Sequence, residues 1–200
     1  MLLTEKVLSS LDECQSLMQT SNDNLCKVHN KITSMREVIS VRMKPCRTYA
    51  CTYFKIWELV PEDFLKKYGE EKCWLLLDSR VLWTADRLRE KYGAINVNTY
   101  HISFKNSPVY GKFNESGYRA FDSRTGAALS QHKFGRALDL HPTATAVSQM
   151  IDDVKKNPTD IAFMHISAVE VEKDKKPVTW FHFDVGNRDG ANDVIQLLKV

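Results

Sequence analysis

The sequence predicts an α+β domain, an antiparallel sheet with helices packed on it, preceded by a helical N-terminal segment. Three patterns support this fold class: apolar residues at heptad spacing over residues 1–45, alternating helix-like and strand-like stretches after about residue 50, and two β-rich stretches near the end. The 200 residues, of which 43% are hydrophobic, suffice for one domain with a real core plus an appendage. We therefore divide the chain into a segment 1–45 and a domain 46–200.

The N-terminal segment has apolar residues at alternating steps of four and three. These residues are Val7, Leu11, Cys14, Met18, Leu25, Val28, Ile32, Met35 and Ile39. The spacing predicts a long helix that forms a coiled coil, either for self-association or for docking to another protein. The alternative is a pair of short amphipathic helices that fold onto the rest of the same chain.

The first half of the domain is predicted to contain a strand followed by two helices. The apolar stretch 51–60 has the composition of a strand, and Pro61 can open a helix that ends at Gly69. Asp78 can cap the next helix, which Gly93 closes.

Two more strands and a helix are expected before the C-terminal hairpin. Residues 94–104 alternate like a strand, and Gly135 to Leu140 is a second candidate. Thr143 or Thr145 can cap a helix over 146–156. The β-rich stretches IAFMHISAVEVE and PVTWFHFDV, joined by KDKK, predict the hairpin.

Composition excludes several classes of protein. The net charge is +3, and no long run of one sign appears, so no nucleic-acid-binding arm is expected. The five cysteines form no CxxC pair, which argues against a disulfide framework and against a cysteine zinc site. Acidic residues interrupt the N-terminal stretch, and no run of about 18 apolar residues occurs. We therefore expect no membrane span and a chain that folds in the cytosol.

The stretch SQHKFGRALDLHP carries a candidate metal site. If its second half is a strand, Asp139 points to one face and His132 lies in the loop that leads into the strand. In WFHFDV, Trp180, His182 and Asp184 alternate onto one face of another strand. Two imidazoles and one carboxylate, from His132, His182 and Asp139, form a zinc site with an open fourth position, which is the catalytic arrangement.

The motif S-x-H-x-x-G-x-A-x-D at residues 130–139, with the late W-x-H-x-D strand, resembles the zinc peptidases of the D-alanyl-D-alanine carboxypeptidase family, whose fold the hedgehog signalling domain shares. FKIWELVPEDFLKKYG and ESGYR make the chain similar to phage-encoded members, over about residues 54–188. The resemblance implies a zinc peptidase that hydrolyses peptidoglycan stem peptides. It also implies a phage lysin or a virion-associated protein, made in the host cytoplasm and acting at the bacterial wall.

The resemblance assigns the zinc ligands to His132, Asp139 and His182. It assigns the substrate-facing arginine to Arg119, which can also stabilise an oxyanion. Ser130 is the small polar neighbour of the first histidine and is a further substrate-binding candidate.

The general base is the point at which this sequence departs from many members of the family. The acid that stands three residues before the last histidine is replaced by Thr179, which cannot accept the proton. Glu170, on the preceding strand, is the matching acid if it pairs with Trp180, and Glu172 or Asp184 are the alternatives. Trp180 could belong to the core or form a pocket wall that contacts substrate, and we expect Asp184 to orient a ligand. Because of Thr179, a non-catalytic binding module that keeps the fold and the zinc is the second functional hypothesis.

Overall fold

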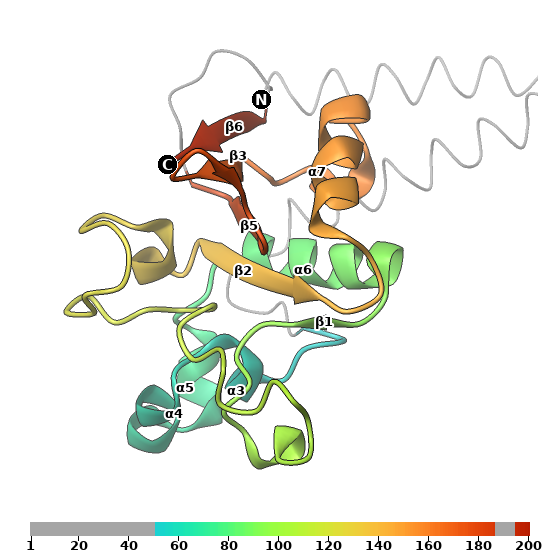
Figure 1. Cartoon of the computed structure of the whole chain (residues 1–200). Helices are drawn as coiled ribbons and strands as arrows, with labels where there is room; N and C mark the ends of the chain where they lie inside the picture. The colour runs from blue at the N-terminus through green and yellow to red at the C-terminus, as the bar shows by residue number, and fades with distance from the viewer. Residues whose placement is uncertain (1–50, 187–194) are drawn as a thin grey trace, which may run out of the picture. The chain divides into compact units, whose positions relative to one another are not determined.

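A computed structural model of the chain describes residues 51–186 and 195–200, so the predictions for residues 1–45 lie outside the described part. Within that part, the predicted α+β class is confirmed, because helices accompany a six-stranded sheet (Figure 1). In the described residues, no helix is long and apolar enough to cross a membrane.

The helices fall into a cluster before the sheet and two longer helices that pack on it. Their bounds are α3 Ile56–Leu59, α4 Glu62–Tyr68, α5 Glu70–Trp74, α6 Ser79–Tyr92 and α7 Val147–Lys156, with 3-10 turns η1 Ile102–Phe104, η2 Gln131–Phe134 and η3 Ile161–Phe163. The predicted cap of α6 is confirmed, because the Asp78 side chain accepts a hydrogen bond from the Arg80 backbone N–H at 2.9 Å. Gly69 and Gly93 end α4 and α6 as predicted.

Three sequence predictions about these elements are wrong. The stretch 51–60, expected to be a strand, contains α3, because Glu58 accepts a hydrogen bond from the Lys55 backbone N–H at 2.8 Å and closes a helical turn. Helix α7 begins after Ala146, with no side-chain cap from a threonine. The first three residues of IAFMHISAVEVE form η3, which is capped by the Asp160 side chain.

The sheet has the strand order β1-β2-β5-β3-β4, with β6 added beside β3. The strands are β1 Ile95–Asn96, β2 Ala137–Pro142, β3 Ala168–Lys173, β4 Lys176–Pro177, β5 Phe181–Asp184 and β6 Gln196–Lys199. All pairs are antiparallel except β3 with β6, which is parallel and was not anticipated. Only two residues of the predicted strand 94–104 join the sheet.

The two faces of the sheet have different chemistry. One face belongs to the hydrophobic core that includes the buried sides of α6 and α7, and its large side chains include Leu138, Leu140, Phe181, Phe183 and Val169. The opposite face carries Asp139 of β2 directly across from His182 of β5. Ala137 and Ala168 lie across from Asp184 on either side, and their small side chains leave room above the strands.

Candidate metal centre

The turn η2 presents His132 to the polar face of the sheet. Gly135 ends this turn with φ +66, a left-handed conformation that favours glycine. A Cβ at this position would lie 1.8 Å from the Leu76 carbonyl oxygen, so the close approach also requires a glycine. The chain then enters β2, which brings Asp139 beside the histidine.

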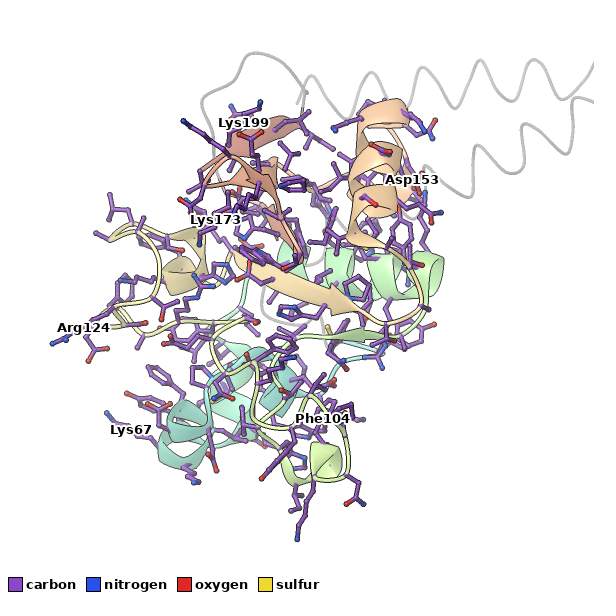
Figure 2. All side chains as sticks on the ribbon, in the orientation of Figure 1. Lys67, Phe104, Arg124, Asp153, Lys173 and Lys199 are labelled. Atoms are coloured by element: carbon purple, nitrogen blue, oxygen red, sulfur yellow. The ribbon has the colours of Figure 1, made fainter. Side chains whose placement is uncertain are left out.

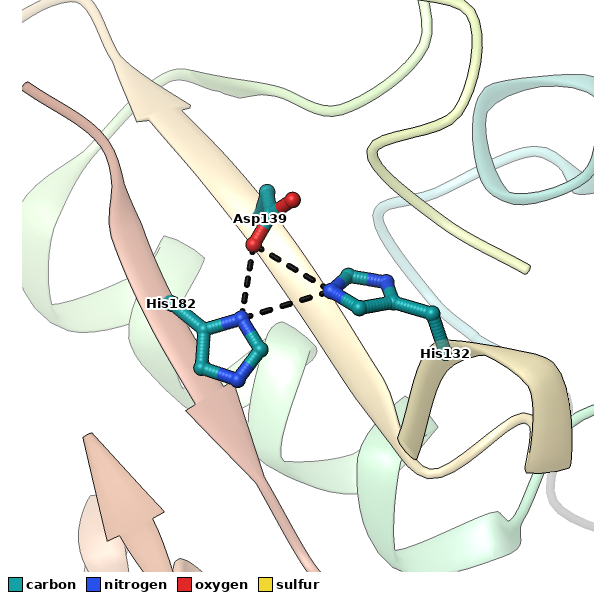
Figure 3. Close-up of side chains that lie close together, drawn as sticks. All are labelled: His132, Asp139 and His182. Carbon is teal, nitrogen blue, oxygen red and sulfur yellow. Dashed lines mark hydrogen bonds and ion pairs between the residues drawn. The ribbon is translucent and has the colours of Figure 1, made fainter. Parts of the chain in front are cut away.

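His132, Asp139 and His182 converge from three elements on one point (Figure 3). His182 Nδ1 lies 2.7 Å from Asp139 Oδ1, and His132 Nε2 lies 3.3 Å from the same oxygen. The two imidazole nitrogens are 3.3 Å apart. The ligand atoms of the three side chains therefore lie within 3.3 Å of one another, which agrees with the convergence expected from the sequence.

The hydrogen bond on the far side of His132 determines its tautomer. His132 Nδ1 lies 2.7 Å from the Gly117 carbonyl oxygen, which can only accept, so Nδ1 carries the proton. The lone pair on Nε2 therefore faces a carboxylate oxygen of Asp139. Two acceptors that face each other in a buried site repel, and a cation between them would remove the repulsion.

Burial and mutual contact perturb the titration of all three groups. Burial lowers the pKa of His132, which keeps this imidazole neutral and able to bind a metal. Burial acts to raise the pKa of Asp139, but the two imidazoles outweigh it and hold the pKa below its usual range. Burial acts to lower the pKa of His182, but the hydrogen bond to Asp139 outweighs it and raises the pKa. Metal binding at His182 would displace this shared proton.

The donor set and its spacing fit zinc. Tetrahedral zinc with bonds of about 2.0–2.1 Å to nitrogen separates neighbouring ligand atoms by about 3.3 Å. Two of the three separations in the cluster already have this value, 3.3 Å, and the third, 2.7 Å, is the hydrogen bond that a metal would replace. The buried cluster can thus hold a metal ion, and its nitrogen and oxygen donors are those that zinc accepts.

Arg119 forms a hydrogen bond with the Asp139 carboxylate of the cluster. Its Nη2 donates to Asp139 Oδ2 at 2.5 Å, and its Nε donates to the Glu115 carbonyl oxygen at 2.6 Å. The guanidinium therefore occupies the outer oxygen of Asp139 and leaves Oδ1 for the two histidines. Its Nη1 has no hydrogen-bond partner among the described residues, and Arg119 lines the pocket over the cluster. The prediction that Arg119 faces the substrate is compatible with this arrangement, because Nη1 could donate a hydrogen bond to a substrate while Nη2 bonds Asp139.

The strand register brings Glu170 to the same pocket as His182. Ala168 pairs with Asp184 and Val169 with Phe183, which is two residues away from the pairing of Glu170 with Trp180 that the sequence suggested. A shift of two residues keeps every side chain on its face, so Glu170 still lines the pocket. Its negative charge contributes to the raised pKa of His182.

Of the other residues considered, Asp184 lines the pocket, whereas Glu172 and Thr179 do not. Asp184 lines the pocket and accepts a hydrogen bond from the Gly186 backbone N–H at 3.1 Å. Glu172 follows a register shift in β3, does not line the pocket, and lies 3.4 Å from the Lys199 ammonium. Thr179 is exposed and also lies outside the pocket lining. Of the acids considered for the base, Glu170 and Asp184 therefore reach the site.

The pocket over the cluster has a volume of about 570 Å³, and the predicted residues Ser130 and Trp180 line it. The lining also includes Gln131 and Lys173, which were not predicted from the sequence. Gln131 has a buried side-chain oxygen without a hydrogen-bond partner in the described part, and its position beside His132 was the available signal. Lys173 belongs to the KDKK stretch that was predicted to join the hairpin strands, and nothing in the sequence indicated that it reaches the pocket.

In comparisons with known proteins, no family model, no curated protein and no solved structure matches the chain.

Proposed function

We propose that the chain is a zinc-dependent peptidase that hydrolyses peptidoglycan stem peptides, as a phage lysin or a virion-associated protein that degrades the wall. The observation that carries this proposal is the buried His132, Asp139 and His182 cluster at the bottom of an open pocket. Three ligands of this kind leave a position for water or substrate, unlike the closed sites of structural zinc. The peptidoglycan substrate follows from the motif resemblance at residues 130–139 and 180–184.

Zinc bound by these residues would polarise a peptide carbonyl and lower the pKa of a water molecule. Side chains of the protein would transfer the proton and bind the substrate oxygen. Glu170 lines the pocket on the His182 side and can accept the proton of the attacking water, then deliver it to the leaving amine. Arg119 keeps Asp139 in place through Nη2 and can donate from Nη1 to a substrate oxygen.

Metal analysis tests the first half of the proposal. We expect about one zinc per chain in the purified protein, and we expect His132→Ala or His182→Ala to abolish it. His141 provides a matched control, because its Nε2 lies 3.0 Å from the Ser116 hydroxyl and it stacks on Phe113, outside the cluster. Full zinc occupancy in a folded His132→Ala protein would show that the cluster is not the zinc site.

Incubation with purified sacculi, followed by mass spectrometry of released fragments, tests the second half. General-base assistance is worth about 10²–10⁴-fold in rate, so Glu170→Gln should slow release by that factor while zinc stays bound. Glu172→Gln makes the same chemical change outside the pocket and should release fragments at the wild-type rate. If Glu170→Gln is as fast as wild type, the base is Asp184 or another acid.

A second candidate function is a non-catalytic zinc-binding module of the virion. The exposed Thr179, at the position where many related peptidases carry their acid, favours it. Zinc-loaded wild-type protein that releases no fragments from sacculi of several wall types would support this second function over the first.

A further inference from the structure

The pocket extends well beyond the metal cluster. Its lining runs from the loop residues Thr125 to Ser130 on one side to Lys173, Trp180 and Leu198 on the other. A volume of about 570 Å³ is in the range of sites that bind a small ligand or several residues of a peptide. The side that carries Lys173 is therefore available to a part of the ligand that is remote from the metal.

The charges that line this pocket are unequally compensated. Its acidic side chains are Asp139, Glu170 and Asp184, and its basic side chains are Arg119 and Lys173. Arg119 is paired with Asp139 at 2.5 Å. Lys173, in contrast, is in no ion pair with a carboxylate of the described residues, and its ammonium lies 5.3 Å from the centre of the Trp180 ring.

A lysine in this environment suits an anionic ligand. The Trp180 ring attracts the ammonium through its π face and restricts the side chain, but it does not satisfy the hydrogen-bond donors. A carboxylate that enters the pocket could accept from the ammonium and form a charge-assisted hydrogen bond. Leu198 also lines the pocket.

The hairpin that carries Lys173 has a tight turn that is hydrogen-bonded to the residue after β6. Lys173 pairs with Lys176 across a two-residue turn, Asp174 and Lys175, whose φ angles are 51° and 62°. Such a turn usually has glycine at its second position, so a lysine there adopts a strained backbone that the surroundings must hold. The Asp174 N–H donates to the Val200 carbonyl oxygen at 2.9 Å and ties the turn to the end of β6. Lys173 therefore stands at the end of β3, directly before this hydrogen-bonded turn, and its side chain is labelled in Figure 2.

We propose that Lys173, held over Trp180, binds a carboxylate of the peptide ligand, so that the pocket selects acidic peptides over their neutral counterparts. The inference rests on the proposed function only in that the ligand is a peptide. It adds a specificity site on the hairpin side of the pocket, separate from the residues that hold the metal.

The test compares a synthetic stem peptide that has free carboxylates with the same peptide in which the carboxylates are amidated, an almost isosteric change. Each peptide carries a fluorescent label and is titrated with zinc-loaded protein, and Kd is measured by fluorescence anisotropy. Wild-type protein should bind the carboxylate form about 10-fold more tightly, which corresponds to about 1.4 kcal/mol. Raising the salt from 0.05 M to 0.5 M should reduce the preference, because Lys173 is exposed and its charge is screened by salt.

Lys173→Gln should abolish the preference without changing the affinity for the amidated peptide. Lys176→Gln is the matched control, because Lys176 lies on the same hairpin, carries the same charge and does not line the pocket. Equal affinity of wild-type protein for the two peptides would overturn the inference. Equal losses in the two variants would also overturn it, since they would indicate only the general charge of the hairpin.

Mass spectrometry of the peptide after each titration separates this inference from the proposed function. A preference for the carboxylate peptide without any hydrolysis supports the Lys173 site and counts against the peptidase. Hydrolysis of both peptides with equal affinity supports the peptidase and counts against the Lys173 site.

Discussion

Replacement of Gly135 by alanine tests how η2 is joined to β2. The φ of +66 costs an L-residue roughly 1–2 kcal/mol. The added Cβ would lie 1.8 Å from the Leu76 carbonyl oxygen, so the backbone must move by about 1.2 Å to restore even a short contact of about 3 Å. That movement would break the 2.9 Å hydrogen bond from the Asp78 N–H to the Gly135 carbonyl, which is worth about 0.5–1.5 kcal/mol.

The sum for Gly135→Ala is a loss of about 1.5–3.5 kcal/mol in the free energy of unfolding. For a chain of this size, each kcal/mol lowers Tm by about 2–4 °C. Gly111→Ala is a matched control, because Gly111 has φ +68 and its added Cβ would meet nothing within 4 Å. The control should lose only the conformational part, about 1–2 kcal/mol.

Urea denaturation of both variants measures the difference between these two losses, and a zinc titration measures its consequence for the site. Because His132 lies in the turn that Gly135 ends, Gly135→Ala should also weaken zinc binding, while Gly111→Ala should leave it unchanged. If Gly135→Ala is no less stable than Gly111→Ala, the reasoning from the Leu76 contact is refuted.

Three further predictions concern the framework of the site. Asp78→Ala removes the cap of α6 and the bond to the Arg80 N–H, and should cost about 1 kcal/mol in urea denaturation. Lys133→Met removes two hydrogen bonds to carbonyl oxygens of the loop 120–130, so amide hydrogen exchange in this loop should accelerate; unchanged exchange would show that Lys133 does not hold it. Burial raises the pKa of Glu58 in the folded protein above its ordinary 4.5. Its favourable contribution to the free energy of unfolding is therefore fully present below pH 4.5 and is lost as the pH rises through the pKa of the folded protein. Glu58→Gln should therefore flatten the decline in stability above pH 4.5, and identical pH profiles for wild type and variant would contradict this assignment.

The metal-site candidates could be predicted because their spacing carries geometric information. In a strand, residues two apart share a face, so the sequence alone placed Trp180, His182 and Asp184 together. The glycine and alanine between His132 and Asp139 indicated a turn and an open space above the strand. The pairing of Asp139 with His182 required a strand register, yet any register of the right parity brings both side chains to one face.

The short helices and strand ends could not be predicted with the same success. The stretch 51–60 has a β-like composition, but the Glu58 side chain closes a helical turn on the Lys55 backbone N–H. Residues 94–104 alternate like a strand, but after β1 the Asn98 N–H bonds to the Glu58 carbonyl oxygen instead of to the sheet. In both cases a hydrogen bond outside the strand pattern outweighs a weak local preference.

The sequence by itself indicated the α+β fold class and the three candidate metal ligands, because periodicity within each stretch shows which residues share a face. Only the tertiary structure decided which acids reach the pocket, since Glu170 and Glu172 differ by a register shift within β3. It also decided the contacts of Arg119 and Lys173, which lie far in the sequence from Asp139 and are brought to its pocket by folding. Such contacts depend on how strands and loops pack in three dimensions, and local sequence patterns contain no information about that packing.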